Sequence, residues 1–206
     1  MNETRKDHWE CIYGSKSEGE LSWHQDTPEI SLELAELAGV TPSHRVIDVG
    51  GGASRFVDGL IARGIRDISV LDLSQAALDA QRARLGPRGA DVAWIVADIT
   101  TWSPERVYDL WHDRAVFHFL VEPSDRAAYL ERLSRALRTG GHAIIATFAP
   151  DGPEKCSGLP VIRYSPETLA DVLGPDYKLT AQRYQKHETP SGLVQSFQFS
   201  VFRKTR

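Results

Sequence analysis

Short β-branched runs alternate with amphipathic segments along the chain, and this alternation constrains the fold more than any other feature of the sequence. Strands are predicted at residues 44–49, 68–73, 92–97, 107–115 and 142–148. Helices are predicted between them at residues 53–63, 74–84 and 124–137, with Ser74 as an N-cap and Gly64 and the Gly86-Pro87 pair as helix ends. Strands that alternate with helices form a parallel sheet covered on both faces, so an α/β, Rossmann-like fold is expected.

The last third of the sequence has a different pattern. Two longer strands, at residues 177–187 and 192–203, flank a turn that is too short for a parallel crossover. The sheet is therefore expected to end in an antiparallel hairpin. Before the hairpin, the sequence predicts a turn at Gly140-Gly141, a loop at residues 150–160 and a short helix at residues 166–173. A further helix is expected near the start, with Thr27 as its N-cap and Pro28 as its first residue.

Length and charge limit the possible partners. The 206 residues suit a single domain over residues 1–206, with residues 1–26 as an N-terminal lid and residues 150–206 as a substrate-side loop and hairpin. A net charge of −4 and the lack of a dense Lys/Arg run disfavour nucleic acid as a partner. The polar N-terminus and the absence of a long apolar run predict no membrane partner and a cytoplasmic protein. Cys11 and Cys156 lie far apart, outside any zinc-binding spacing, so no metal site is expected.

A glycine-rich turn at residues 46–54, with the sequence VIDVGGGAS, joins the first predicted strand to the following helix. Glycines at such a turn let the backbone approach a ligand closely, although they also occur in plain tight turns. Gly50 and Gly52 fit the first two places of a dinucleotide fingerprint, but the third place falls on Arg55. Asp48 would repel a pyrophosphate and is suited to accept a hydrogen bond from a ligand ammonium.

Two more aspartates end the next two predicted strands. Asp72 follows the glycine turn by about 20 residues, where an acidic residue grips ribose hydroxyls. Asp98 ends the third strand, where it can accept a hydrogen bond from an adenine amine. Each aspartate alone can be an N-cap or a turn residue, but three carboxylates at successive strand ends indicate recognition of an ammonium, a ribose and an adenine.

These residues resemble the motifs of the class I S-adenosylmethionine (SAM)-dependent methyltransferases, close to their small type 11/type 12-like members. Asp48, Gly50 and Gly52 match the D-x-G-x-G motif of that family, while Ser54 replaces its usual third glycine. The resemblance implies a seven-stranded sheet, SAM as the cofactor and S-adenosylhomocysteine as its product. It also implies cofactor contacts at the following positions: Asp48, Gly50, Gly52, Ser54, Asp72, Leu73, Asp98, Ile99 and Asp113.

The resemblance further implies that the segment after the fourth strand borders the sulfonium. Arg114 is unexpected beside a cationic methyl donor, and we expect it to orient an anionic substrate or the SAM carboxylate, or else to form an ion pair. His118 is either a general base, because its ordinary pKa is near 6.5, or a hydrogen-bonded wall of the pocket. Arg114 and His118 are therefore the candidate catalytic residues.

Candidate substrate contacts lie at both ends of the sequence. Trp9 and Tyr13 are four residues apart, hence on one face of a helix, and with Trp23 they suggest either a lid over the cofactor or a helix packed on the sheet. Cys156 in the loop and His187 before the hairpin turn are expected at the mouth of the site. A soft metal held by Cys156, His118 and His187 is a weaker alternative.

Three functions are compatible with the sequence. The first is methylation of a small polar or soft-nucleophile metabolite. The second is methylation of protein lysines, because some members of the family with an Asp-Lys pair at the position of Asp113 and Arg114 act on lysines. The third is a SAM-binding regulator without catalysis. A small-molecule partner is expected, with a protein substrate as the alternative.

Overall fold

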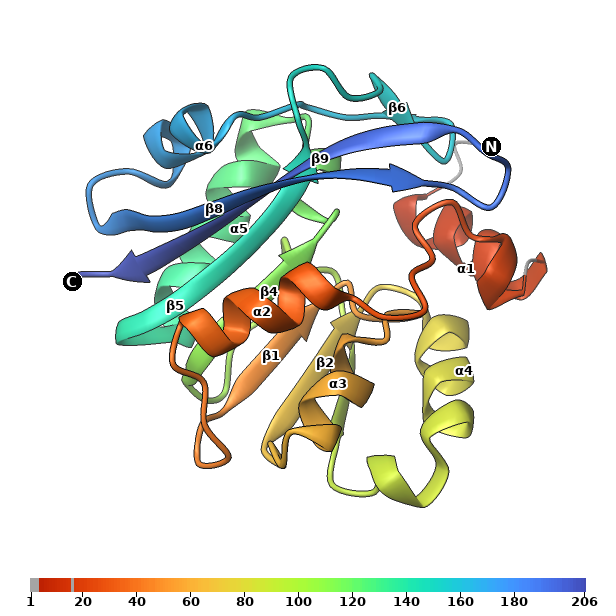
Figure 1. Ribbon diagram of the computed structural model, residues 1–206, viewed down its shortest axis with the longest axis horizontal. Coiled ribbons are helices and arrows are strands. Elements are labelled where there is room, and N and C mark those ends of the chain that lie inside the picture. Colours follow the sequence, from red (N-terminus) through yellow and green to blue (C-terminus); the bar gives the residue numbers. More distant parts are fainter. Residues whose placement is uncertain (1–3, 16) are drawn as a thin grey trace.

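The computed structural model describes residues 4–15 and 17–206. Within these residues a seven-stranded sheet has the order β3-β2-β1-β4-β5-β9-β8, in which β9 is antiparallel to both β5 and β8 and the other pairs are parallel (Figure 1). The strands are β1 (Val46–Val49), β2 (Ile68–Asp72), β3 (Ala93–Val96), β4 (Tyr108–Arg114), β5 (Leu137–Phe148), β8 (Tyr177–Glu188) and β9 (Val194–Lys204). The predicted Rossmann-like sheet with an antiparallel final hairpin is confirmed.

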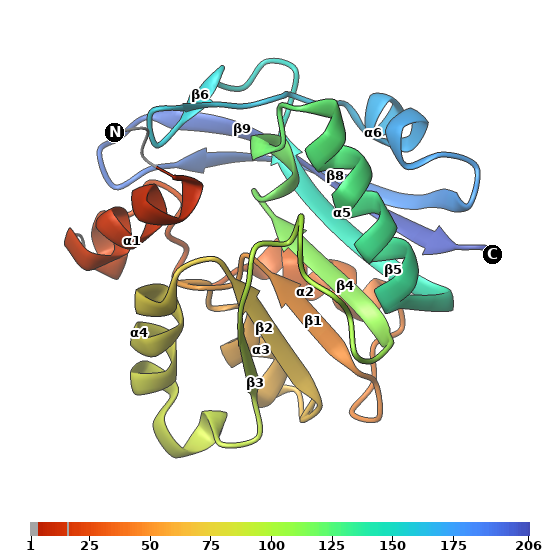
Figure 2. The ribbon, with the colours of Figure 1, turned by 180° about the vertical axis from the view of Figure 1, so that it is seen from behind.

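Helices cover both faces of the sheet (Figures 1 and 2). One face carries α2 (Glu29–Leu37), α3 (Phe56–Ala62) and α4 (Gln75–Leu85), and the other carries α5 (Pro123–Ala136) and α6 (Pro166–Leu173). Side chains alternate between the two layers along the central strands, so Val46 packs with the first layer and Ile47 with the second. Every residue of β1 and β2 is buried, as expected for parallel strands between two helical layers.

Several predicted boundaries were wrong by a few residues. Ser74 caps α4 as predicted, its hydroxyl accepting a hydrogen bond from the Ala77 N–H. The helix α2, however, begins at Glu29 with Pro28 as the N-cap residue, so the predicted cap at Thr27 is one residue too early. The helix α3 begins at Phe56 rather than at residue 53, because the Ser54 hydroxyl accepts the Phe56 N–H and keeps the preceding residues in the turn.

The strand β5 starts directly after α5 at Leu137, not after a glycine turn. Leu137 pairs with Tyr108 and His142 pairs with Leu110, so the residues between them form an irregularity in the ladder. Gly140 takes a φ of +80° there, a conformation that a glycine adopts without strain. The predicted loop at residues 150–160 also contains a small antiparallel pair, β6 (Lys155–Cys156) and β7 (Leu159–Pro160).

The N-terminal helix α1 (Arg5–Ser15) lies beside the start of α4, at the carboxyl ends of β1 and β2 (Figures 1 and 2). The Glu10 carboxylate accepts hydrogen bonds from the Ser74 hydroxyl at 2.9 Å and from the Gln75 N–H at 2.8 Å. A carboxylate at the N-terminus of α4 is favourable because the free N–H groups there carry partial positive charge. Glu10 thus fastens α1 over the edge of the sheet where α/β proteins bind ligands.

None of the described helices has the length and apolar character needed to cross a membrane.

Candidate cofactor and substrate site

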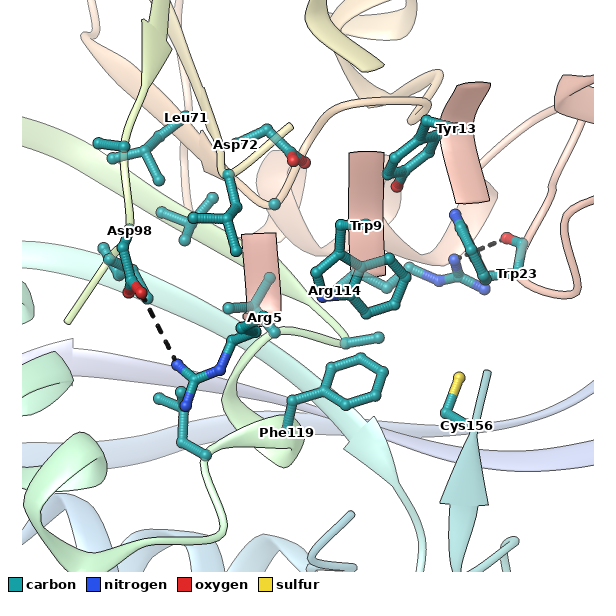
Figure 3. A pocket seen from close by; sticks show the side chains of 18 of the residues that line it. Arg5, Trp9, Tyr13, Trp23, Leu71, Asp72, Asp98, Arg114, Phe119 and Cys156 are labelled. Carbon is teal, nitrogen blue, oxygen red and sulfur yellow. Dashed lines mark hydrogen bonds and ion pairs between the residues drawn. The ribbon is translucent and has the colours of Figure 1, made fainter. Parts of the chain in front are cut away.

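A cavity opens at the carboxyl edge of the sheet beneath α1 (Figure 3). The empty space of the cavity, together with its open mouth, amounts to about 830 Å³. It brings together most of the predicted cofactor and substrate residues. They come from α1 and the segment after it, from the ends of the parallel strands and from β6: Trp9, Tyr13, Trp23, Gly50, Asp72, Leu73, Asp98, Ile99, Arg114 and Cys156. A smaller neighbouring pocket is lined by Asp48, Ser54, Gly50 and Arg114, among others.

The glycine turn touches its neighbours so closely that side chains would not fit. Gly50 has a φ of +68°, and a Cβ there would lie 2.0 Å from Cγ2 of Val116. A Cβ on Gly52 would lie 2.5 Å from the Ala77 Cβ and 2.7 Å from the Asp72 Oδ2. Both glycines are therefore required by the packing of the turn, and Gly50 also forms part of the cavity wall.

Asp72 stands at the end of β2 with both carboxylate oxygens turned to backbone amides. Its Oδ2 accepts the Gly52 N–H at 2.9 Å and its Oδ1 accepts the Ser74 N–H at 2.8 Å. Burial raises the pKa of Asp72 to about 6 against the lowering effect of these hydrogen bonds. Because each carboxylate oxygen has two lone pairs, both oxygens retain the capacity to accept a ligand hydroxyl.

Asp98 lies at the opposite side of the cavity from Trp23 (Figure 3), and the next residue, Ile99, also lines the cavity. The Asp98 Oδ1 accepts hydrogen bonds from the N–H and the hydroxyl of Thr100. Its Oδ2 lies 3.9 Å from Nη1 of Arg5, a residue of α1 that the sequence did not indicate and that also pairs with Asp125. Arg5 thus connects α1 to this end of the cavity.

Asp48 lies in the smaller pocket and is held by a histidine that sequence reasoning missed. Its Oδ1 lies 2.6 Å from Nδ1 of His112, whose Nε2 is 2.9 Å from the Ser31 hydroxyl. The ring of Phe56 stacks on His112 with 3.9 Å between ring centroids. The other oxygen, Oδ2, is buried and has no partner among the described residues, so it is the acceptor that Asp48 can offer to a ligand.

Asp113 does not line the cavity. Its carboxylate accepts hydrogen bonds from the Tyr129 hydroxyl at 2.6 Å and from the Val116 N–H at 2.8 Å. Burial raises the pKa of Asp113 to about 6. The side chain holds the segment that follows β4, in which Ala115 takes an unusual φ of +72° and turns the backbone so that Arg114, Ala115 and Val116 all reach the cavity. Its predicted contact with the cofactor remains a prediction.

Arg114 lines both pockets. Its Nη1 donates to the Trp23 carbonyl oxygen at 2.9 Å, and its guanidinium carbon lies 4.9 Å from the centre of the Phe197 ring. The Nε and Nη2 atoms are shielded from solvent and have no hydrogen-bond partner among the described residues. The ion pair that the sequence left open for Arg114 is not formed within this part of the chain.

Four aromatic rings form a cluster across the cavity. Trp9 lies 6.2 Å from Tyr13, 5.7 Å from Trp23 and 5.2 Å from Phe119, measured between ring centroids. Burial, and then the nearby Asp72, raise the pKa of Tyr13 well above its ordinary value, so its phenol is neutral at physiological pH. Trp9 and Tyr13 do share one helix face, as the spacing predicted, and that face is turned to the cavity rather than to the flank of the sheet (Figure 3).

The candidate residues Cys156, His118 and His187 are not gathered at one point. Cys156 lines the cavity, where burial raises the pKa of its thiol to about 11. His118 is buried behind the wall, its Nδ1 accepting the Phe148 N–H at 3.3 Å, and burial lowers its pKa to about 3. His187 donates to the Ser22 carbonyl oxygen at 2.8 Å. Among the described residues no group of three His, Cys, Asp or Glu side chains has the arrangement of a metal site.

Some lining residues have no signal in the sequence. Arg5 and Phe197 reach the cavity from the two ends of the chain, and only the fold brings them together. Phe119 does have a sequence signal, because it lies in the segment that already contains the candidate residues Arg114 and His118. His112 lies in the same segment, and its pairing with Asp48 follows from the parallel register of β1 and β4, in which the two residues are neighbours.

Comparison with known proteins agrees with this geometry. Residues 46–141 match a family model described as a methyltransferase domain. The chain is 41% identical over 107 residues to a trans-aconitate 2-methyltransferase from Methylobacterium radiotolerans, an alignment that covers 51% of this chain and 37% of the relative. The chain thus spans well under half the length of this curated relative.

Two solved structures share the fold over nearly the whole chain. The N-methyltransferase NodS from Bradyrhizobium japonicum, in complex with S-adenosylhomocysteine, superposes with a TM-score of 0.74 at 16% identity and covers 98% of this chain and 100% of that one. A structure concerned with conversion of a disulfide bond into a thioacetal group in echinomycin biosynthesis has a TM-score of 0.77 at 21% identity, with 98% and 93% covered. Residues 46–141 therefore match the methyltransferase domain family, and the fold of nearly the whole chain is that of the class I SAM-dependent methyltransferases.

Proposed function

We propose that this chain binds SAM in the cavity beneath α1 and transfers its methyl group to a small molecule. The observation that carries the proposal is the placement of Asp72 and Asp98 at the ends of adjacent strands, both facing the cavity that Gly50 also lines. In this proposal Asp72 accepts the ribose hydroxyls, while Asp98 and Ile99 hold the adenine. The methionine end extends past Gly50 toward Ser54 and the free Oδ2 of Asp48.

The reaction requires little from the protein beyond alignment and exclusion of water. A lone pair of the acceptor forms a bond to the methyl carbon as the carbon–sulfur bond breaks, and the electron pair of that bond stays on sulfur. The products are the methylated acceptor and neutral S-adenosylhomocysteine, and an acceptor that carries a proton releases it to solvent. Such an in-line displacement is accelerated mainly by holding the two reactants in the correct geometry.

The aromatic cluster supports a small acceptor. Trp9, Tyr13 and Trp23 close the cavity from the N-terminal side, so we propose that residues 1–26 act as a lid within one domain, although residues 1–3 and 16 lie outside the described residues. A covered cavity leaves less room for a lysine on a folded protein than for a metabolite. The relative named above acts on trans-aconitate, which also supports a small-molecule acceptor.

Incubation with SAM that carries a tritiated methyl group tests the proposal. The enzyme is supplied in parallel with a protein-free metabolite extract and with a denatured lysate, and the Asp72→Ala variant serves as the inactive control. We expect label in small molecules and none with the variant. Label in protein would favour the lysine methyltransferase alternative, and label in neither, with intact SAM binding, would favour a SAM-binding regulator.

A further inference from the structure

The guanidinium of Arg114 has one free edge. Its Nη1 is occupied by the Trp23 carbonyl oxygen, whereas Nε and Nη2 are shielded from solvent and have no partner among the described residues. These two atoms lie side by side on the same edge of the planar group. An edge with two parallel N–H donors matches the two oxygens of a carboxylate, which it can bind in a bidentate manner.

Within the described residues Arg114 has no ion-pair partner, although Asp48 in the neighbouring pocket favours its charged form. Arg5 at the other end of the cavity forms ion pairs with Asp98 and Asp125, but within the described chain no carboxylate lies within 4 Å of the Arg114 guanidinium. Burial lowers the pKa of Arg114 to about 10, which still leaves it cationic at neutral pH. Leaving donors of a charged group buried without acceptors is costly, so an unmatched cation beside a ligand cavity indicates that the ligand supplies an anion.

We infer that Arg114 binds a carboxylate of the methyl acceptor through its Nε and Nη2 donors, so that the enzyme acts on small carboxylic acids. This inference rests on the proposed function, because it assigns the acceptor of the same cavity. The proposed cofactor positions at Asp72 and Asp98 lie toward one side of the cavity, while Arg114 lies beside Trp23 and near Cys156 toward the other (Figure 3). An acceptor has to occupy the part of the cavity that the adenine and ribose leave free.

An anionic acceptor also suits the charge of the reaction. Both SAM, through its sulfonium, and Arg114 are cations, and a carboxylate bound between them offsets their repulsion. A flat apolar ring lies over the guanidinium, since the centre of the Phe197 ring is 4.9 Å from its carbon, and the Trp9 and Trp23 rings line the same cavity. Planar unsaturated or aromatic carboxylates therefore fit this part of the cavity better than compact, highly hydrated anions.

Binding of simple probes to the enzyme saturated with S-adenosylhomocysteine tests the inference. The probes are benzoate, cinnamate and indole-3-carboxylate, each compared with its neutral amide, by calorimetry and by fluorescence of the tryptophans that line the cavity. We expect at least one carboxylate to bind roughly ten- to hundredfold more tightly than its amide, as hydrogen bonds to charged groups allow. We expect Arg114→Gln to remove this preference. Arg114→Lys keeps the charge but not the two parallel N–H donors, so it should retain only part of the preference.

The matched control is Arg106→Gln, which removes the same charge beyond the other end of β4, where Arg106 pairs with Asp67. This variant should keep the carboxylate preference of the wild type. The inference is overturned if carboxylates and amides bind alike or not at all, or if Arg114→Gln leaves the preference intact. It is also overturned if Arg114→Gln weakens S-adenosylhomocysteine but not 5′-methylthioadenosine, because Arg114 would then hold the carboxylate of the cofactor. A wild-type protein that fails to bind S-adenosylhomocysteine would instead refute the proposed function itself.

Discussion

The backbone N–H of Gly52 donates a hydrogen bond to Oδ2 of Asp72 over 2.9 Å, although the two residues are 20 positions apart in the sequence. The bond ties the glycine turn after β1 to the end of β2, so the two parts of the proposed cofactor site form one unit. Asp72 is therefore both a support for the turn and the proposed acceptor for the ribose.

Cofactor affinity should depend on pH through Asp72. Burial raises the pKa of Asp72 to about 6, so the carboxyl is protonated at pH 5 and loses its charge as an acceptor. We expect the affinity for S-adenosylhomocysteine to increase between pH 5 and pH 7, by at most tenfold per pH unit, and to level off above pH 7. Calorimetric titration across this range measures the effect. The Asp72→Asn variant should bind more weakly with a flat profile; a variant with the slope of the wild type would assign the titration to another group.

Removing the Tyr129 hydroxyl should destabilise the fold more than it affects cofactor binding. That hydroxyl donates to Asp113 at 2.6 Å and accepts the Trp111 Nε1–H at 2.8 Å. At pH 8 Asp113 is charged, and we expect Tyr129→Phe to lower the free energy of unfolding by about 1.5–3 kcal/mol. The loss should shrink at pH 5, since Asp113, with its pKa near 6, is then protonated.

Urea unfolding at the two pH values measures this difference. Tyr164→Phe is the control, because Tyr164 is buried against the same Phe117 ring and loses the same atom. A large loss of S-adenosylhomocysteine affinity in Tyr129→Phe at unchanged stability would show that Asp113 serves the cofactor, as the family resemblance implied.

Glu10→Ala should release the N-terminal helix. The variant removes the carboxylate that accepts hydrogen bonds from Ser74 and Gln75 at the start of α4. We expect faster proteolysis within residues 5–26, weaker binding of S-adenosylhomocysteine and an unchanged core. Limited trypsin digestion with and without the cofactor product measures the first effect, and Glu29→Ala at the exposed start of α2 is the control. Equal cleavage of wild type and Glu10→Ala would argue against a lid held by Glu10.

His118 should remain neutral over the working pH range. Burial lowers its pKa to about 3, and Arg114 adds to the effect. Its ring signals in a ¹H–¹⁵N spectrum, assigned by comparison with His118→Gln, are expected to keep the chemical shifts of a neutral imidazole between pH 8 and pH 5. We also expect methylation of the acceptor pool to have the same pH dependence in the wild type and in His118→Gln. A signal that titrates near pH 6.5 would restore His118 as a candidate general base.

The sequence determined the fold class and most of the proposed cofactor site, because both depend on local patterns. Alternating strand and helix signals fix a parallel sheet, and the carboxyl ends of its strands necessarily share one edge. Asp48, Asp72 and Asp98, each at the end of a strand, therefore had to come to the same edge of the sheet. Element boundaries were less certain, as at Pro28 and at the irregular start of β5, because a few hydrogen bonds at each end decide them.

The substrate side of the cavity was decided only by the tertiary structure. Phe197 of β9 and Arg114 of β4 come together there through long-range packing that leaves no local periodicity to read. The same holds for charge: the sequence shows that Arg114 is cationic, but only the packed structure shows that two of its donors are buried without an acceptor. Burial and the distances between side chains decide which residues line the substrate side and whether their polar groups have partners. Both arise only when distant segments pack together, so the sequence specified the residues and the fold specified their chemistry.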